Sequence, residues 1–210
     1  MIVVNFKNYK FGKAALELAR LIEIYCQKSI IAAPFLDIYE IAKNTSLPIY
    51  AQHVDFAEPG NSTGAVIPEI LEAAGAKGSI INHSEHPLSL LSIKKTIDRC
   101  HEAGLNLIVC VPSLAIARKV KALQPFAIAY EDPQLVSSGK SITYFKAHEV
   151  KLFSDLLSGS GILPLCGAGI SSSEDVKEAK SLGCVGVLVS SAVANSQHPE
   201  KFLKEVSSIF

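Results

Sequence analysis

Eight short apolar runs, spread along the whole chain, constrain its fold more than any other feature. Their residues are rich in Val, Ile, Leu and Ala and show no alternation of apolar with polar side chains, which is typical of strands buried on both faces of a parallel sheet. The runs are IVVNF from Ile2, SIIAAP from Ser29, PIYAQHV from Pro48, SIINH from Ser79, LNLIVCVP from Leu105, FAIAY from Phe126, GILPLCG from Gly161 and VGVLVS from Val185.

Segments with helical periodicity lie between these runs. Residues 14–24 and 93–103 carry apolar side chains near i, i+3 and i+4 spacing, and Gly104 follows the second segment as a helix stop. Residues 172–182 behave likewise, with acidic side chains in the first turn and Gly183 past the end. The chain therefore alternates strands with helices.

This alternation predicts a (β/α)8 barrel of the α/β class. Eight units in 210 residues leave roughly 26 residues for each, which is the small end of the range for such barrels. An open doubly wound sheet is the alternative, but that fold usually carries a glycine-rich fingerprint after its first strand, and NFKNYKFGK has none. Because no linker or low-complexity tract divides the chain, we expect a single domain over residues 1–210.

The composition limits the partners of the protein. Twenty basic and twenty acidic residues cancel, so the strong basic field of a nucleic-acid-binding protein is absent, and we expect no nucleic acid partner. The apolar run in the starting segment MIVVNFKNYK is far too short for a signal peptide core, and no stretch has the length of a membrane span, so we expect a cytoplasmic protein without a membrane partner. Five scattered cysteines without a C-x-x-C pair indicate buried, reduced thiols rather than disulfides or a zinc site.

Polar residues gather where the predicted strands end. Chemistry in barrels of this kind collects at the carboxyl ends of the strands. The polar residues at these ends are Asn5, Lys7, Gln52, His53, Asn82, His83, Ser84, Glu85 and Glu131. A single His or Glu in such a place commonly serves only as a cap or a hydrogen-bond partner. A closed barrel, however, points the ends of distant strands into one mouth, so we expect several of these residues to meet.

The last two predicted strands end in small-residue loops. CGAGISSSED from Cys166 leads into a helix start, and VGVLVSSAVA from Val185 places Ser190 and Ser191 where a short helix can begin. Free backbone N–H groups at such turns bind anions, and barrels commonly hold a phosphate after strands seven and eight. The alternative is that Gly167 and Gly169 only allow a tight turn. Both loops together favour a phosphate.

Three motifs resemble, in order and spacing, those of the triosephosphate isomerase family. They are NFKNY at Asn5, INHSE at Ile81 and AYEDPQLVSSG at Ala129, and the likeness covers essentially the whole chain. The compact length, INHSEHPL and the PQL of the third motif are similar to the archaeal branch of that family. The resemblance implies an isomerase that interconverts dihydroxyacetone phosphate and D-glyceraldehyde 3-phosphate in glycolysis and gluconeogenesis, without a cofactor or metal.

The resemblance also assigns roles to the residues that match the motifs. It implies that Glu131 is the general base, that neutral His83 polarises the carbonyl, that Lys7 supplies a cation beside the substrate, and that Asn5 supports the oxyanion region. The backbone N–H groups implied to hold the phosphate are those of Ser137, Gly169, Ser190 and Ser191. Residues 132–139 are implied to form a lid that closes over the phosphate. Ser84 and Glu85 look like a helix start, whose positive end would disfavour an imidazolium at His83.

Two positions depart from the family pattern in the lid. Asp132 replaces the proline that usually follows the glutamate, and Ser137 replaces a glycine. Ser190 and Ser191 stand where many members have two glycines, but main-chain N–H groups can come from serine as well. We therefore expect altered lid motion rather than inactivity.

Two alternative functions are compatible with the sequence. A phosphate-sugar barrel of different chemistry would share the fold and the anion site, but is not expected to keep Asn5, Lys7, His83 and Glu131 together. A non-catalytic binding or scaffold protein derived from the isomerase is the second alternative, and Asp132 and Ser137 favour it slightly. The segment DFAEPGNSTGAV from Asp55 matches the interlocking loop of the family, which implies a homo-oligomer, either a dimer or a tetramer.

Overall fold

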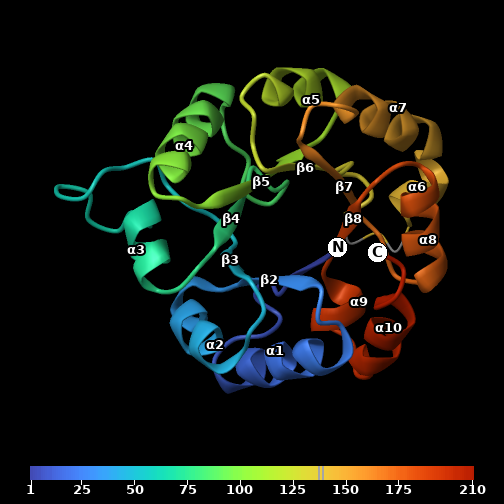
Figure 1. Ribbon diagram of the computed structural model, residues 1–210, viewed down its shortest axis with the longest axis horizontal. Helices are drawn as coiled ribbons and strands as arrows, with labels where there is room; N and C mark the ends of the chain where they lie inside the picture. The colour runs from blue at the N-terminus through green and yellow to red at the C-terminus, as the bar shows by residue number, and fades with distance from the viewer. Residues whose placement is uncertain (137, 139) are drawn as a thin grey trace.

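Eight parallel strands close into a barrel that the helices surround (Figure 1). The computed structural model describes residues 1–136, 138 and 140–210. The strands are β1 (Ile2–Asn5), β2 (Ser29–Ala33), β3 (Ile49–Ala51), β4 (Gly78–Ile81), β5 (Asn106–Val111), β6 (Ala127–Tyr130), β7 (Leu163–Gly167) and β8 (Gly186–Val189). Each strand coincides with one of the apolar runs, β4 beginning one residue before its run, so the predicted (β/α)8 barrel is confirmed.

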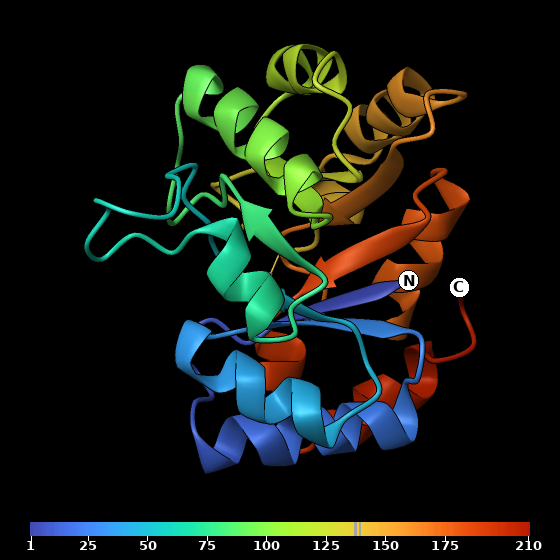
Figure 2. The same ribbon diagram turned by 60° about the vertical axis from the view of Figure 1, so that its left-hand side comes forward.

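At least one helix follows each strand, and the helices form the outer layer seen in Figures 1 and 2. They are α1 (Lys13–Tyr25), α2 (Ile38–Asn44), α3 (Pro68–Ala73), α4 (Leu90–Glu102), α5 (Leu114–Lys121), α6 (Ile142–Phe145), α7 (Ala147–Leu157), α8 (Ser173–Ser181), α9 (Ser191–Ala194) and α10 (Pro199–Val206), with a 3₁₀ turn at Phe35–Asp37. No helix in the described part of the chain has both the length and the apolar character needed to cross a bilayer.

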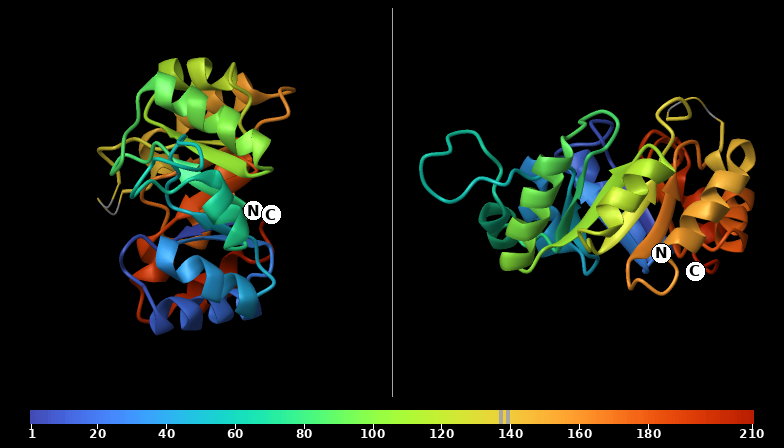
Figure 3. Two further views of the ribbon diagram at one scale, coloured as in Figure 1. Left: turned by 90° about the vertical axis from the view of Figure 1, so that its left-hand side faces the viewer. Right: turned by 90° about the horizontal axis from the view of Figure 1, so that it is seen from above.

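The closure of the barrel joins the two ends of the chain. Strand β1 pairs with β2, where Ile2 lies opposite Ser29, and also with β8, where Ile2 lies opposite Val187. From β2 to β7, each strand pairs with the strand before it and the strand after it in the chain. The carboxyl ends of all eight strands therefore face the same end of the barrel, which is the upper edge in the right-hand view of Figure 3.

Apolar side chains fill the protein in two shells. The inner shell lies inside the barrel and includes Val3, Tyr50, Ile108 and Leu165. The outer shell lies between the strands and the helices, and it is the larger of the two. Both faces of the strands are thus buried, which explains why their sequences lack the alternation of a half-exposed sheet.

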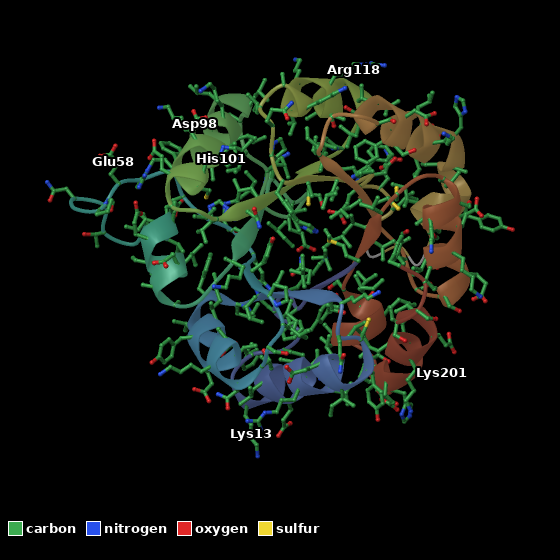
Figure 4. The ribbon with its side chains drawn as sticks, in the orientation of Figure 1. Lys13, Glu58, Asp98, His101, Arg118 and Lys201 are labelled. Carbon is green, nitrogen blue, oxygen red and sulfur yellow. The ribbon has the colours of Figure 1, made fainter. Side chains whose placement is uncertain are left out.

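Most charged side chains lie on the outside of the helical layer. Figure 4 shows the labelled side chains at the periphery of the molecule, far from the barrel axis. They are Lys13, Glu58, Asp98, His101, Arg118 and Lys201. None of these six residues lines the cavity at the mouth of the barrel.

Candidate active site

A cavity of about 320 Å³ opens at the carboxyl end of the barrel. It brings together seven of the eight site residues predicted from the sequence, from the end of β1 and from the segments that follow β1, β4, β6, β7 and β8. These residues are Asn5, Lys7, His83, Glu131, Gly169, Ser190 and Ser191. The eighth, Ser137, lies outside the described residues. Residues more than 180 positions apart in the sequence thus share one small space.

Glu131 follows β6 directly, and its side chain is only 6% exposed. Its backbone N–H donates to the carbonyl of Val111 at the end of β5, at 3.0 Å, which continues the sheet pairing by one residue. The carboxylate faces the ring of His83, with 3.6 Å between Oε2 and Nε2. Among the described residues, Oε2 is buried and accepts no hydrogen bond. This oxygen is therefore available to take up a proton from a bound molecule.

Cys110 lies beside Glu131, inside the barrel. Burial raises the pKa of its thiol well above the ordinary value, and the nearby carboxylate of Glu131 raises this pKa further. The thiol is therefore neutral and does not compete for the role of base. The other four cysteines are likewise free and buried, as the sequence predicted.

His83 is held by the loop that follows β4. The backbone N–H of Glu85 donates to Nδ1 of His83 at 3.2 Å. Because Nδ1 accepts this bond, the neutral ring carries its hydrogen on Nε2, which is the nitrogen that faces Glu131. The ring itself is buried, with 7% of the residue exposed.

The predicted helix start at Ser84 and Glu85 is wrong. These residues form a turn, and helix α4 begins only at Leu90, with Ser89 as its N-cap. The side chain of Ser89 accepts the N–H of Ser92, one of the donors that the first turn of α4 would otherwise leave unpaired. The backbone N–H of Glu85, rather than the start of a helix, therefore faces Nδ1 of His83.

Lys7 adopts a left-handed backbone conformation, with φ of 45°. Such a conformation costs a residue with a Cβ about 1–3 kcal/mol, so neighbouring contacts must hold it. Its N–H donates to Oδ1 of Asn5 at 2.9 Å, and its carbonyl accepts from Nε2 of Gln52 at 3.0 Å. The Lys7 ammonium then reaches the Glu85 carboxylate at 2.6 Å. Residues at the end of β1 and in the loops after β1, β3 and β4 therefore form one connected network.

The loop after β7 lies against the segment that follows the lid. Ala168 and Gly169 both have positive φ, of 75° and 71°. The N–H of Ile142 donates to the carbonyl of Ala168 at 3.1 Å, and a Cβ on Gly169 would collide with the carbonyl of Lys140. The segment that follows the lid, at Lys140 and Ile142, therefore packs against the loop that carries Gly169.

Asp175 orders the other half of this loop. Its carboxylate accepts the N–H groups of Ser171 at 2.9 Å and Ser172 at 3.0 Å, and the Ser172 side chain accepts the Asp175 N–H in return. Although burial alone would raise it, these hydrogen bonds lower the pKa of the Asp175 carboxyl. The reciprocal pair forms a capping box at the start of α8 and fixes the loop next to Gly169.

Some residues of the cavity were not predicted from the sequence. Tyr9, in the loop after β1, and Asn195, at the end of α9, also line it. Neither residue follows a strand directly, so the presence of polar residues at the strand ends does not predict them. Serine at 190 and 191 does begin a short helix, as expected: Ser190 is the N-cap of α9.

A family model described as Triosephosphate isomerase matches residues 1–208. A Sulfurisphaera tokodaii protein named triosephosphate isomerase is 35% identical over 212 residues, covering 98% of this chain and 93% of the relative. A Methanocaldococcus jannaschii protein of the same name is 36% identical over 214 residues and covers 98% of both chains.

The chain belongs to the triosephosphate isomerase family. The family resemblance drawn from its three motifs is therefore confirmed, and the similar curated relatives are mostly archaeal, as the compact length suggested. Among solved structures, the Bartonella henselae triosephosphate isomerase superposes with a TM-score of 0.73 at 19% identity, over 97% of this chain and 96% of the other. At that identity, the comparison supports the barrel fold alone.

Two histidines stack between the loops after β3 and β4. The rings of His53, after β3, and His86, after β4, lie 4.0 Å apart and are tilted by 11°. His53 Nε2 also lies 3.3 Å from a carboxylate oxygen of Asp55. In residues 1–136, 138 and 140–210, no three His, Cys, Asp or Glu side chains are grouped as a metal site requires.

Proposed function

We propose that this protein interconverts dihydroxyacetone phosphate and D-glyceraldehyde 3-phosphate, as a triosephosphate isomerase of glycolysis and gluconeogenesis. The observation that carries the proposal is the pairing of Glu131 and His83 across 3.6 Å, in a cavity that Lys7 and two small-residue loops also line. The family membership supports it. The proposal includes no cofactor and no metal.

Glu131 is the general base of the proposed reaction. It takes a proton from the carbon next to the substrate carbonyl and returns it to the neighbouring carbon. Its Oε2 suits this task because it is buried and accepts no hydrogen bond from the described residues. The same logic of a glutamate base and a neutral histidine is a known pattern for this enzyme class.

His83, Lys7 and Asn5 stabilise the charge that develops on oxygen. Removing the proton leaves an ene-diolate, and donors fixed in advance around its oxygens lower the barrier most in a site that excludes water. The Nε2 hydrogen of His83 and the ammonium of Lys7 are such donors. Since Asn5 Oδ1 already accepts from Lys7 and Gln52, its Nδ2 is the end left for a substrate oxygen.

The loops after β7 and β8 bind the phosphate in this proposal. Backbone N–H groups of Gly169, Ser190 and Ser191 supply the grip, and Ser137 in the lid is proposed to complete it. In this proposal, residues 132–139 close over the bound phosphate and exclude water, which prevents the ene-diolate from losing its phosphate group. At the base of the lid, Asp132 accepts the N–H of Gln134 at 2.9 Å.

A coupled assay of triose phosphate interconversion tests the proposal. The wild-type protein is expected to turn over both substrates, and Glu131→Gln to lower kcat by at least about a hundredfold, the range of a lost general base. Glu205→Gln, an exposed glutamate on α10, is the matched control and should keep the wild-type rate. Equal rates for wild type and Glu131→Gln would remove Glu131 from the mechanism.

Inhibitor binding distinguishes an enzyme from a binding protein of the same fold. A phosphorylated hydroxamate mimics the ene-diolate, so tight binding is expected only where the site stabilises that intermediate. Simple phosphate binding would not discriminate the two. A hydroxamate that binds no better than inorganic phosphate, measured by calorimetry, would favour the non-catalytic alternative.

We further propose a cytoplasmic homo-oligomer, dimeric or tetrameric, without nucleic acid or membrane partners. The segment after β3 supports the oligomer. Asp55 closes its base, since its N–H donates to the carbonyl of Val66 and its Oδ2 accepts the Val66 N–H, both at 2.8 Å. The residues between extend well beyond the barrel in Figures 1 and 3. A loop of this length suits contact with a second copy.

A further inference from the structure

Asn82 connects strand β4 to His83 in an unusual backbone conformation. Its φ is 57°, in the left-handed region that residues with a Cβ rarely adopt. Asparagine tolerates this region better than most residues, because its short polar side chain bonds locally. The chain turns sharply at this point, so the direction in which His83 leaves the strand depends on Asn82.

The side chain of Asn82 uses both of its polar ends. Nδ2 donates to the carbonyl of Cys110 on β5 at 2.7 Å, and Oδ1 accepts the N–H of Leu88 at 2.8 Å. A carbonyl can only accept and a backbone N–H can only donate, so a single orientation of the amide satisfies both. Asn82 therefore ties the start of its loop to the next strand and to the end of the same loop.

The loop that Asn82 closes contains the contacts that hold the His83 ring. Between Asn82 and Leu88, the N–H of Glu85 donates to His83 Nδ1 at 3.2 Å, and the N–H of His86 donates to the His83 carbonyl at 2.8 Å. The first of these bonds places the ring hydrogen on Nε2, toward Glu131. A change in the path of the loop would loosen that bond and release the ring.

We propose that Asn82 is a positioning residue for the reaction: through both ends of its amide it fixes the orientation and the tautomer of His83. This inference rests on the function proposed above. Asn82 acts only through His83 and the loop, so its loss should lower the rate of the chemical step more than the affinity for substrate.

The variant Asn82→Gly tests this role most directly. Glycine accepts the left-handed backbone, so the fold is kept, while both side-chain bonds are lost. We expect kcat to fall about 10- to 100-fold, the scale of a small misplacement of a catalytic group, with KM nearly unchanged. The ¹⁵N NMR signals of His83 should change from the Nε2–H tautomer alone to a mixture of both tautomers.

Gln124→Gly is the matched control. Gln124 has a similar left-handed φ of 53° and a side-chain bond to the carbonyl of Lys121, but it precedes β6 at the opposite end of the barrel. This variant should keep the wild-type kcat and the wild-type His83 signals. If Asn82→Gly does not fold, Asn82→Asp keeps the acceptor for Leu88 and removes the donor to Cys110, and the same loss in kcat and change in tautomer are expected.

Two results would overturn the proposal. One is an unchanged His83 tautomer in the Asn82 variant, and the other is a fall in kcat that Gln124→Gly shows equally. The tautomer measurement needs no activity. If the wild-type protein fails to isomerise triose phosphates, the proposed function is wrong, while a tautomer mixture in Asn82→Gly would still support the positioning role.

Discussion

At the scale of single residues, Gly167 makes room for the Glu131 carboxylate. A Cβ at this position would lie 2.5 Å from Oε1 of Glu131, too close for any real contact. Gly167 ends β7 and does not have the positive φ that would itself require glycine, so the need is one of space. The neighbouring strand thus fixes where the carboxylate can lie relative to His83.

Gly167→Ala should therefore impair activity without preventing folding. The added methyl group displaces the carboxylate, and we expect kcat to fall about 10- to 100-fold, as for other small misplacements of a reacting group. Gly186→Ala, at the start of β8, is equally crowded, with its Cβ 2.5 Å from the Met1 carbonyl, but it lies at the far end of the barrel. It should lower stability and leave kcat intact. The same kcat in both variants would contradict this explanation.

At the scale of elements, the loops after β3 and β4 are joined by the stacked rings of His53 and His86. Burial lowers the pKa of His53 from its ordinary value of 6.5; hydrogen bonding to Asp55 opposes this shift, and the nearby His86 adds to it. The folded protein thus favours neutral His53. Between the lowered pKa and 6.5, the unfolded chain binds more protons than the folded one, so acid destabilises the fold in that window.

His53→Gln should reduce this acid sensitivity. We expect the free energy of unfolding of the wild-type protein to fall as the pH drops from 7.5 through 6.5 and below, and to fall less in the variant. Urea unfolding at several pH values measures the difference. His198→Gln removes a histidine whose side chain is 78% exposed, and should follow the wild type. Parallel curves for wild type and His53→Gln would show that His53 does not carry the effect.

The elements were largely predictable, and the contacts between loops were not. Apolar runs such as IVVNF mark buried strands by composition alone, and all eight were found. Ser84 and Glu85 resemble a helix start because both residues are common there, yet they form a turn. The ion pair of Lys7 with Glu85 joins residues 78 positions apart, and no local pattern reports such a contact. The left-handed backbone of Asn82 is equally invisible to periodicity.

At the scale of the whole molecule, the barrel depends on both ends of the chain. Strand β1 lies between β2 and β8, so the ring cannot close until the last strand is in place. We propose on this ground that residues 1–210 form one domain. Unfolding in urea should then follow a single transition, with circular dichroism and the fluorescence of the six tyrosines giving the same midpoint. Two separate midpoints would contradict a single domain.

The proposed oligomer predicts a mass in solution of two or four times 22.5 kDa. Light scattering during gel filtration measures it. Removing residues 57–64 from the protruding segment should reduce the mass, because Asp55 and Val66 would still close its base while the contact surface is lost. Replacing Glu58 alone with Gln is the milder control. A wild-type protein that runs as a monomer would refute the oligomer without touching the fold.

Isomerisation in D₂O is the sharpest measurement of proton transfer by Glu131. We expect the wild-type protein to convert D-glyceraldehyde 3-phosphate to dihydroxyacetone phosphate carrying deuterium on the carbon that gains a proton, because the base exchanges with solvent. We also expect Glu131→Gln to slow formation of this product by at least about a hundredfold. Product formed by Glu131→Gln at the wild-type rate would show that Glu131 is not the base.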